Sequence, residues 1–169
     1  MRTLALWVAV AAGLSNAPAF AGDRVATFLR NSLDQHSKEL AEAAAAMPAD
    51  KYDFVSPGDG VTFAYLVLHI ADGNYTFCSF IGGVAAPQLP PLTEYDGKEN
   101  LVERMKSSFE FCASAVAGLD DSHMSETLTI DDTKMSRAMA VLALTGGWVT
   151  HYEVQERYLE MNGLRKRQG

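Results

Sequence analysis

The chain has 169 residues, and its 21 acidic and 14 basic side chains give a formal net charge of −7. An acidic chain of this kind lacks the electrostatic footprint that nucleic acid or anionic lipid requires, so we expect neither as a partner. Hydrophobic residues make up 48% of the sequence, which is sufficient for one domain to bury a core of its own. We therefore predict a single globular domain over residues 22–169.

The first 21 residues have the pattern of a secretory signal peptide. Arg2 provides the positive start, residues 4–14 form an apolar segment, and Ala19-Phe20-Ala21 is a small-x-small cleavage site before Gly22. A membrane anchor and a buried N-terminal helix are the alternatives, but this apolar segment is well short of the roughly 20 residues that a spanning helix needs. The pattern predicts a periplasmic or secreted protein with no stable membrane insertion after cleavage.

The region after the cleavage site begins with a long amphipathic helix. Apolar residues recur at helical spacing over residues 23–47, and Pro48 ends the pattern. Residues 49–60 are rich in Asp, Pro and Gly, which predicts a connector. Thr62 is a suitable N-cap for a second helix, which we expect to continue to about Ile81.

Two further connections and a third helix follow. Residues 82–97 contain three prolines, which exclude regular structure there. Apolar residues at helical spacing predict a third helix over residues 98–119. Residues 120–132 are polar and acidic and predict a connector, with a short extended piece at residues 127–130.

The last helix is expected over residues 133–161, with Asn162-Gly163 as its C-cap. We find no strand-period hairpin, internal repeat or glycine-rich phosphate loop in the sequence. Four long amphipathic helices joined by two lengthy connections predict an all-α fold, a four-helix bundle with long crossover loops.

Cys78 and Cys112 are the only cysteines. In an oxidising compartment such a pair is typical of a disulfide. Two buried thiols packed as small hydrophobic groups are the alternative, because cysteine often behaves this way inside helices. A catalytic thiol is disfavoured, since neither cysteine has a histidine near it in the sequence.

Two histidines stand on helices from which they could share an ion. His69 lies among the apolar residues of the second predicted helix, and His151 lies in the fourth. Imidazoles from two facing helices are common ligands of divalent transition metals. A histidine that is hydrogen-bonded within the core is the alternative interpretation for each.

Three segments together resemble the DinB/YfiT-like superfamily, whose members are regarded as metalloenzymes. They are MPADKYDF at residues 47–54, LVLHIAD at 66–72, and the pattern HYxxxxxYLxMNG at 151–163. The resemblance implies a four-helix bundle with a divalent ion bound by three histidines, one on the second helix and two in an H-x-x-x-H pair on the fourth. His69 matches the first of these positions and His151 the last.

The middle ligand position of the family falls on Gly147, which has no side chain with which to bind a metal. Two imidazoles alone bind divalent ions weakly unless other donors complete the shell. Asp72 is one turn beyond His69, and Gln155 is one turn beyond His151, so each lies on the same helix face as a histidine. We therefore predict a site for Ni²⁺, Zn²⁺ or a similar ion formed by His69, His151 and Asp72.

Gly146 and Gly147 are consecutive glycines inside a predicted helix, where each costs about 1 kcal/mol relative to alanine. Either they permit close helix packing, or they leave a hollow beside the two histidines in which a small ligand could bind. We expect the pocket to be formed by Tyr65, Phe77, Gly147, Trp148, Gln155 and Tyr158.

Two functional hypotheses remain open. In the first, the chain is an exported metalloenzyme, for which the resemblance implies metal-dependent hydrolase or thiol-transferase chemistry. In the second, the metal site has decayed and the bundle is a metal-free binding or interaction module with a small-molecule ligand. Analogy with similar bundles suggests a homodimer, and the sequence does not settle the oligomeric state.

Overall fold

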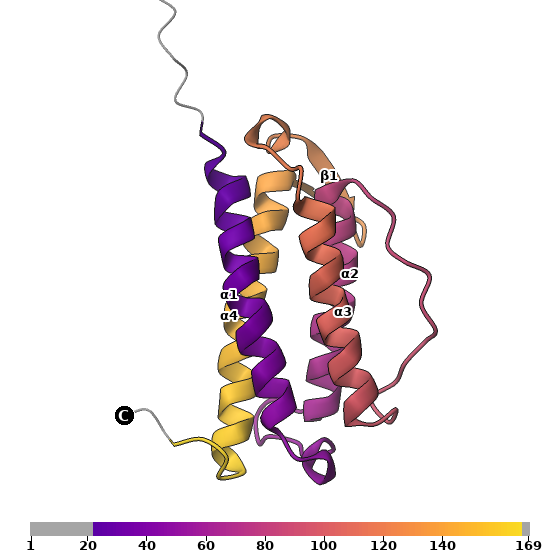
Figure 1. The fold of residues 1–169 in the computed structure, drawn as a ribbon, viewed down its shortest axis with the longest axis vertical. Helices are drawn as coiled ribbons and strands as arrows, with labels where there is room; N and C mark the ends of the chain where they lie inside the picture. Colours follow the sequence, from indigo (N-terminus) through magenta and orange to yellow (C-terminus); the bar gives the residue numbers. More distant parts are fainter. Residues whose placement is uncertain (1–21, 167–169) are drawn as a thin grey trace, which may run out of the picture.

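The computed structural model describes residues 22–166, so the predicted signal peptide lies outside the described residues. Four helices, α1 (Arg24–Ala46), α2 (Phe63–Gly82), α3 (Lys98–Val116) and α4 (Arg137–Met161), form the predicted all-α bundle. Helices α1 and α4 run in one direction and α2 and α3 in the other, so the connection between α2 and α3 crosses the length of the bundle (Figure 1). None of the described helices is both long and apolar enough to cross a membrane.

The helix starts follow from local capping. The Thr62 hydroxyl accepts a hydrogen bond from the Tyr65 N–H at 2.9 Å, and the Ser136 hydroxyl accepts one from the Met139 N–H at 3.2 Å. Each bond satisfies one of the N–H groups that a first helical turn leaves without an intrahelical partner. The predicted N-cap of α2 is therefore confirmed.

The expected start of the last helix was wrong. Residues Thr127–Ile130 (β1) and Thr133–Ser136 (β2) form an antiparallel hairpin, and α4 begins only at Arg137. The two turn residues, Asp131 and Asp132, have φ values of +46° and +63°. A two-residue turn with both φ values positive matches the right-handed twist of the strands, and aspartate tolerates this conformation better than most residues.

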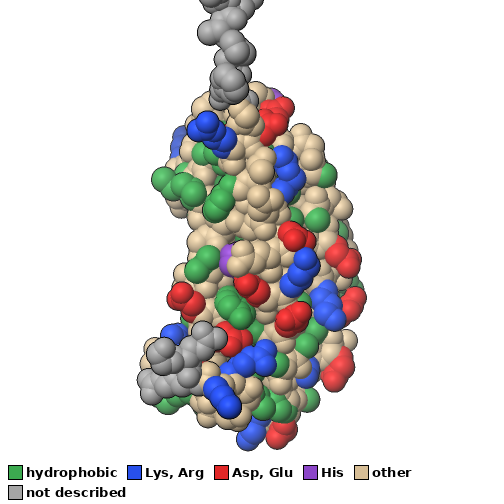
Figure 2. Space-filling view, turned by 60° about the vertical axis from the view of Figure 1, so that its left-hand side comes forward, with side chains coloured by type: hydrophobic (Ala, Val, Ile, Leu, Met, Phe, Trp, Pro, Cys, Tyr) green, Lys and Arg blue, Asp and Glu red, His purple; other side chains and the backbone are tan. Residues whose placement is uncertain are grey.

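The core lies between the four helices and includes the largest fully buried side chains, among them Trp148, Tyr158, Phe63 and Leu29. Acidic and basic side chains are interspersed over the face of the molecule that Figure 2 presents, with hydrophobic side chains between them. A disulfide between Cys78 and Cys112 joins α2 to α3 across a Cα–Cα distance of 5.1 Å. The bridge closes a loop over a sequence separation of 34, for which chain entropy gives about 4 kcal/mol of stabilisation.

A buried hydrogen-bond chain connects three helices at the level of the candidate site. The indole Nε1–H of Trp148 donates to Asn74 Oδ1 at 2.7 Å, and Asn74 Nδ2 donates to Ser108 Oγ at 2.9 Å. The Ser108 hydroxyl in turn donates to the carbonyl of Met105 at 2.7 Å. Every member has a partner, so this polar chain holds the Trp148 ring at one depth in the core.

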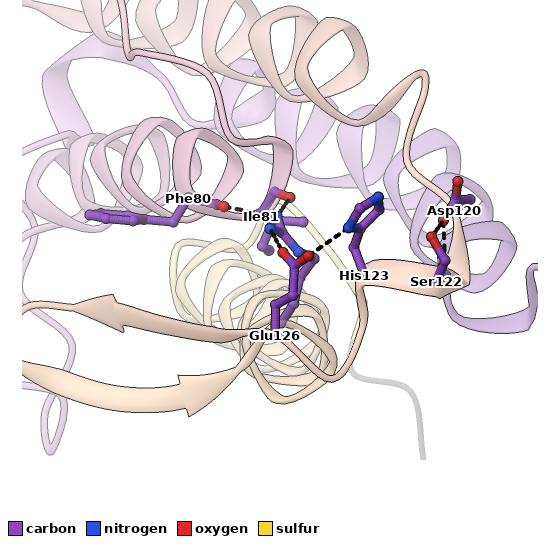
Figure 3. Close-up of polar contacts among 7 residues, drawn as sticks. Phe80, Ile81, Asp120, Ser122, His123 and Glu126 are labelled. Carbon is purple, nitrogen blue, oxygen red and sulfur yellow. Dashed lines mark hydrogen bonds and ion pairs between the residues drawn. The ribbon is translucent and has the colours of Figure 1, made fainter.

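One end of the bundle is held by Arg137 at the start of α4. Its guanidinium donates to the carbonyl oxygens of Phe80 and Ile81 in the last turn of α2, and it forms a 2.8 Å ion pair with Glu126. Glu126 also contacts His123 Nδ1 at 2.6 Å, as Figure 3 shows. A positive group at the C-terminal end of α2 is favourable because the unpaired carbonyls there carry partial negative charge.

Candidate functional site

His69 on α2 and His151 on α4 face one another. Their ring centroids are 5.1 Å apart, and the ring planes are inclined at 79°. The His69 side chain is exposed, whereas His151 is partly buried. The Tyr65 ring, which is itself exposed, stacks on His69 with a centroid distance of 5.9 Å and an interplanar angle of 8°. The two imidazoles are thus brought together at the outer edge of the α2–α4 contact.

A small cavity opens next to this pair. Its volume is about 110 Å³, and it is lined by His69, Ile70, Gly73, Asn74, Phe77, Ala143, Leu144, Gly147, Trp148 and His151. A Cβ atom added at Gly147 would meet only the Cε1 and Nδ1 atoms of His151, both at 3.8 Å, and one added at Gly146 would meet nothing within 4 Å. Neither glycine is required for close helix packing, and the space beside the histidines is a true hollow.

Burial sets the protonation state of His151, the less exposed of the two histidines. Loss of solvent lowers the pKa of His151, and the positive charge of His69 lowers it further. His151 is therefore neutral at pH 7 and has a ring nitrogen lone pair available. Nearby Asp72 is shifted in the opposite sense, because desolvation raises the pKa of its carboxyl group while the charges of Arg104 and His69 oppose that rise.

The other predicted site residues are placed differently. Asp72 is exposed on α2, one turn beyond His69, and does not line the cavity. Gln155 and Tyr158 are both fully buried and are also absent from its lining. The Tyr158 hydroxyl donates to the carbonyl of Val61 at 2.6 Å, whereas both polar atoms of the Gln155 carboxamide lack a partner. Of the predicted pocket residues, Phe77, Gly147 and Trp148 line the cavity, and Tyr65 stacks on His69 without lining it.

Comparison with known protein families tests the family resemblance that the sequence patterns indicate. The family model of the DinB superfamily matches residues 32–154. The chain belongs to the DinB superfamily. The sequence has no significant match among functionally curated proteins.

Two solved structures show the same DinB-like fold. A DinB-like protein from Bacillus subtilis, determined at 2.30 Å resolution, is 17% identical, with a TM-score of 0.67 over 84% of this chain and 96% of its own. A conserved protein from Enterococcus faecalis is 14% identical, with a TM-score of 0.63 over 79% of this chain and 94% of its own. At these identities the likeness establishes the fold alone.

The ion expected in a DinB protein can be tested against the donors present here. A shared ion requires one nitrogen atom of each imidazole to be directed at the same point, about 2.1 Å from that nitrogen. The observed centroid distance between His69 and His151 is 5.1 Å. Within residues 22–166, no group of three or more His, Cys, Asp or Glu side chains is placed to hold a metal ion. The site therefore offers two neighbouring imidazoles, and a bound ion would need other donors.

Sequence reasoning missed two residues of this region of the DinB fold. His36 was not singled out, yet it is only 9% exposed, its ring lies 6.3 Å from that of Trp148, and its Nδ1 contacts Glu39 at 2.8 Å. Asn74 was not singled out, although it lines the cavity and holds the Trp148 indole. Asn74 is the only amide side chain in α2, and its position at helical spacing from Ile70, Ala71 and Cys78 is the signal that could have indicated it.

Proposed function

We propose that this DinB protein binds one divalent transition-metal ion, Ni²⁺, Zn²⁺ or a similar ion, between His69 and His151. The observation that carries the proposal is the facing arrangement of the two imidazoles at a centroid distance of 5.1 Å. The lowered pKa of His151 supports it, because only a neutral imidazole can donate its lone pair to an ion.

Two protein donors leave coordination positions for water or for a substrate. When bound, such an ion would polarise a carbonyl group or activate a water molecule or a thiol, which suits hydrolase or thiol-transferase chemistry. The residues of the site do not select one of these reactions. The proposal therefore concerns metal binding first and the class of reaction second.

The chain itself would contribute positioning and exclusion of water. Trp148, fixed by its hydrogen bond to Asn74, forms a rigid inner wall of the cavity. The Tyr65 ring stacks on the His69 ring. Gly147 leaves space in which a reacting group could lie next to His151. A small substrate would reach the two imidazoles from the exposed side of His69.

We also propose that the protein works outside the cytoplasm. The apolar segment at residues 4–14 and the small-x-small pattern ending at Ala21 support export. The disulfide between Cys78 and Cys112 supports it independently, because such bridges persist in oxidising compartments. Cleavage before Gly22 predicts an N-terminal sequence beginning GDRVATF, which mass spectrometry of the exported protein can test.

Metal titration of the purified protein tests the proposed site. We expect one Ni²⁺ or Zn²⁺ per chain, together with an increase in melting temperature on metal addition. His69→Ala and His151→Ala should each weaken binding by at least about tenfold, because each removes one of two protein ligands. His123→Ala is the matched control, since His123 is an exposed histidine in the short helix η2 (Asp121–His123) and lies outside the cavity lining.

A metal-free binding module is the second candidate. The observation that favours it is that no set of three His, Cys, Asp or Glu ligands is assembled within residues 22–166. In that case the apolar walls formed by Phe77, Leu144 and Trp148 would bind a small molecule directly. If the wild-type protein binds no divalent ion in the metal titration, the result supports this second function.

A further inference from the structure

A second hollow lies between α1 and α3, the two helices in front in Figure 1. Its volume is about 580 Å³, which is within the range of sites that bind small molecules. It shares no lining residue with the cavity beside His69 and His151. This α1–α3 groove is therefore a separate candidate site.

Each helix lines the groove with the same kinds of side chain at the same spacing. A base, a large apolar residue and an acid stand at positions i, i+3 and i+4, namely Arg30, Leu33 and Asp34 on α1, and Lys106, Phe109 and Glu110 on α3. Residues at these spacings share one helix face. The apolar member of each set is buried and the acid of each is exposed, so the groove has an apolar floor between charged rims.

The floor is left open because the other lining residues are small. They are Ser37 on α1, Ala113 on α3 and Ala117 at the end of α3. None of these side chains is long enough to cover Leu33 or Phe109. A ligand with apolar side chains could therefore remove further apolar surface from water.

The charges on the α3 wall are not used within the fold. Among residues 22–166, neither Lys106 nor Glu110 takes part in an ion pair. A base that precedes an acid by four residues is the less favourable order for pairing within a helix. On α1, by contrast, Asp34 pairs with Lys38 at 3.0 Å, and Arg30 donates to a backbone carbonyl beyond the end of α3 at 2.9 Å. The α3 wall therefore offers one available charge of each sign.

The spacing of these two charges sets the length of a matching ligand. Positions four residues apart lie about 6 Å apart along a helix axis. An extended dipeptide spans about 7 Å between its ends. A free amino acid carries both charges on one carbon atom, and each further residue adds about 3.4 Å, so shorter and longer peptides match less well.

We propose that the α1–α3 groove binds a dipeptide with free termini and apolar side chains. The carboxylate of the dipeptide would lie at Lys106 and its ammonium group at Glu110. Its two side chains would pack on the floor formed by Leu33 and Phe109. The proposal goes beyond the metal function and does not depend on it.

An NMR titration of the metal-free protein with leucyl-leucine, in the presence of a chelator, tests the proposal. We expect saturable shifts of the Ala113 and Ala117 amide signals, with a Kd below about 1 mM. N-acetyl-leucyl-leucine and leucyl-leucinamide each lack one terminal charge and should bind about three- to fivefold more weakly. Free leucine, which cannot reach both charges, should bind more weakly still.

Charge variants of α3 test the orientation of the ligand. Lys106→Gln should weaken leucyl-leucine binding about three- to fivefold and leave leucyl-leucinamide binding unchanged, because that ligand has no carboxylate to lose. Glu110→Gln should show the same selectivity with N-acetyl-leucyl-leucine. Glu103→Gln is the matched control, since Glu103 is exposed on α3 and lies outside the groove lining.

A steric variant tests the location. Ala113→Leu should fill the groove and weaken leucyl-leucine binding at least about tenfold. Ser114→Leu adds a leucine at the neighbouring position, which does not line the groove, and should leave binding unchanged. Both positions are exposed, so neither substitution disturbs the core.

Several results would overturn the dipeptide site. The absence of saturable shifts would do so, and so would equal binding of leucyl-leucine and its capped forms, because the termini would then contribute nothing. Equal binding of free leucine would exclude the predicted span. Shifts confined to the cavity beside His69 and His151 would exclude the groove. Each result is obtained without metal, so the proposed metal function stands or fails separately.

Discussion

Alanine at Gly147 should stabilise the protein, and this result would show that helix packing does not require the glycine. Glycine inside a helix costs about 1 kcal/mol relative to alanine. A Cβ at Gly147 has only ordinary van der Waals contacts, to the His151 ring at 3.8 Å, and a Cβ at Gly146 has none within 4 Å. Nothing in the native packing offsets the propensity gain, so each substitution should raise the free energy of unfolding by about 0.5 to 1 kcal/mol.

Gly82 is the matched control within the same bundle. A Cβ at this position would collide with the backbone carbonyl of Ala115, whose carbon lies 2.8 Å away, because α2 and α3 approach closely there. Overpacking of this kind costs about 1 to 3 kcal/mol, so Gly82→Ala should destabilise. The order of stability should therefore be Gly147→Ala above wild type and wild type above Gly82→Ala.

Urea unfolding followed by tryptophan fluorescence measures this order. Trp148 is the only tryptophan within residues 22–166 and is 1% exposed, so its emission reports the core directly. A Gly147→Ala variant that loses more than about 1 kcal/mol with an unchanged m-value would refute the reasoning. Such a loss would mean that α4 needs the glycine for packing, and the hollow would then be incidental.

Three further predictions follow from the contacts that hold the bundle. Arg137→Ala should cost about 1.5 to 3 kcal/mol in urea unfolding, because it removes charged hydrogen bonds to the last turn of α2; an unchanged midpoint would exclude this role. Reduction of Cys78–Cys112 should lower the free energy of unfolding by about 4 kcal/mol, whereas a midpoint insensitive to reductant would contradict the bridge. Hydrogen bonds from the first turn of α1 lower the pKa of the Asp121 carboxyl group in the folded state. Its stabilisation is therefore present above the unfolded pKa of about 3.9 and is lost as pH falls through the folded pKa. Asp121→Asn should reduce the acid sensitivity of the melting temperature in this range, and an identical pH profile would contradict the assignment.

The helices could be predicted because their signals are local. Apolar periodicity, Pro48 and the Thr62 cap each act within a few residues, and the structure places the helix ends within three or four residues of where these signals put them. The hairpin before α4 was missed because its turn uses Asp131-Asp132 rather than the Asn-Gly or Asp-Gly pair that usually marks such turns. Residues 133–136 were then assigned to the helix that follows them.

The candidate site was harder to predict, because it depends on which faces of the helices contact one another. His69 and His151 could be paired through the family resemblance and their helical positions, and the structure places them together. The burial of His36 follows from the α1–α4 contact, where its ring lies near Trp148, and the sequence of α1 alone does not indicate it. Whether the two glycines permitted packing or left a hollow also depended on the neighbouring helix, which only the three-dimensional structure supplies.

Metal content per chain, measured on tag-free protein purified without chelators and then reconstituted with Ni²⁺ or Zn²⁺, tests the central claim most directly. The account predicts a value near one for the wild type and a value near zero for His151→Ala at the same free metal concentration. A wild-type value near zero after reconstitution, or equal values for the two proteins, would contradict an ion shared by His69 and His151.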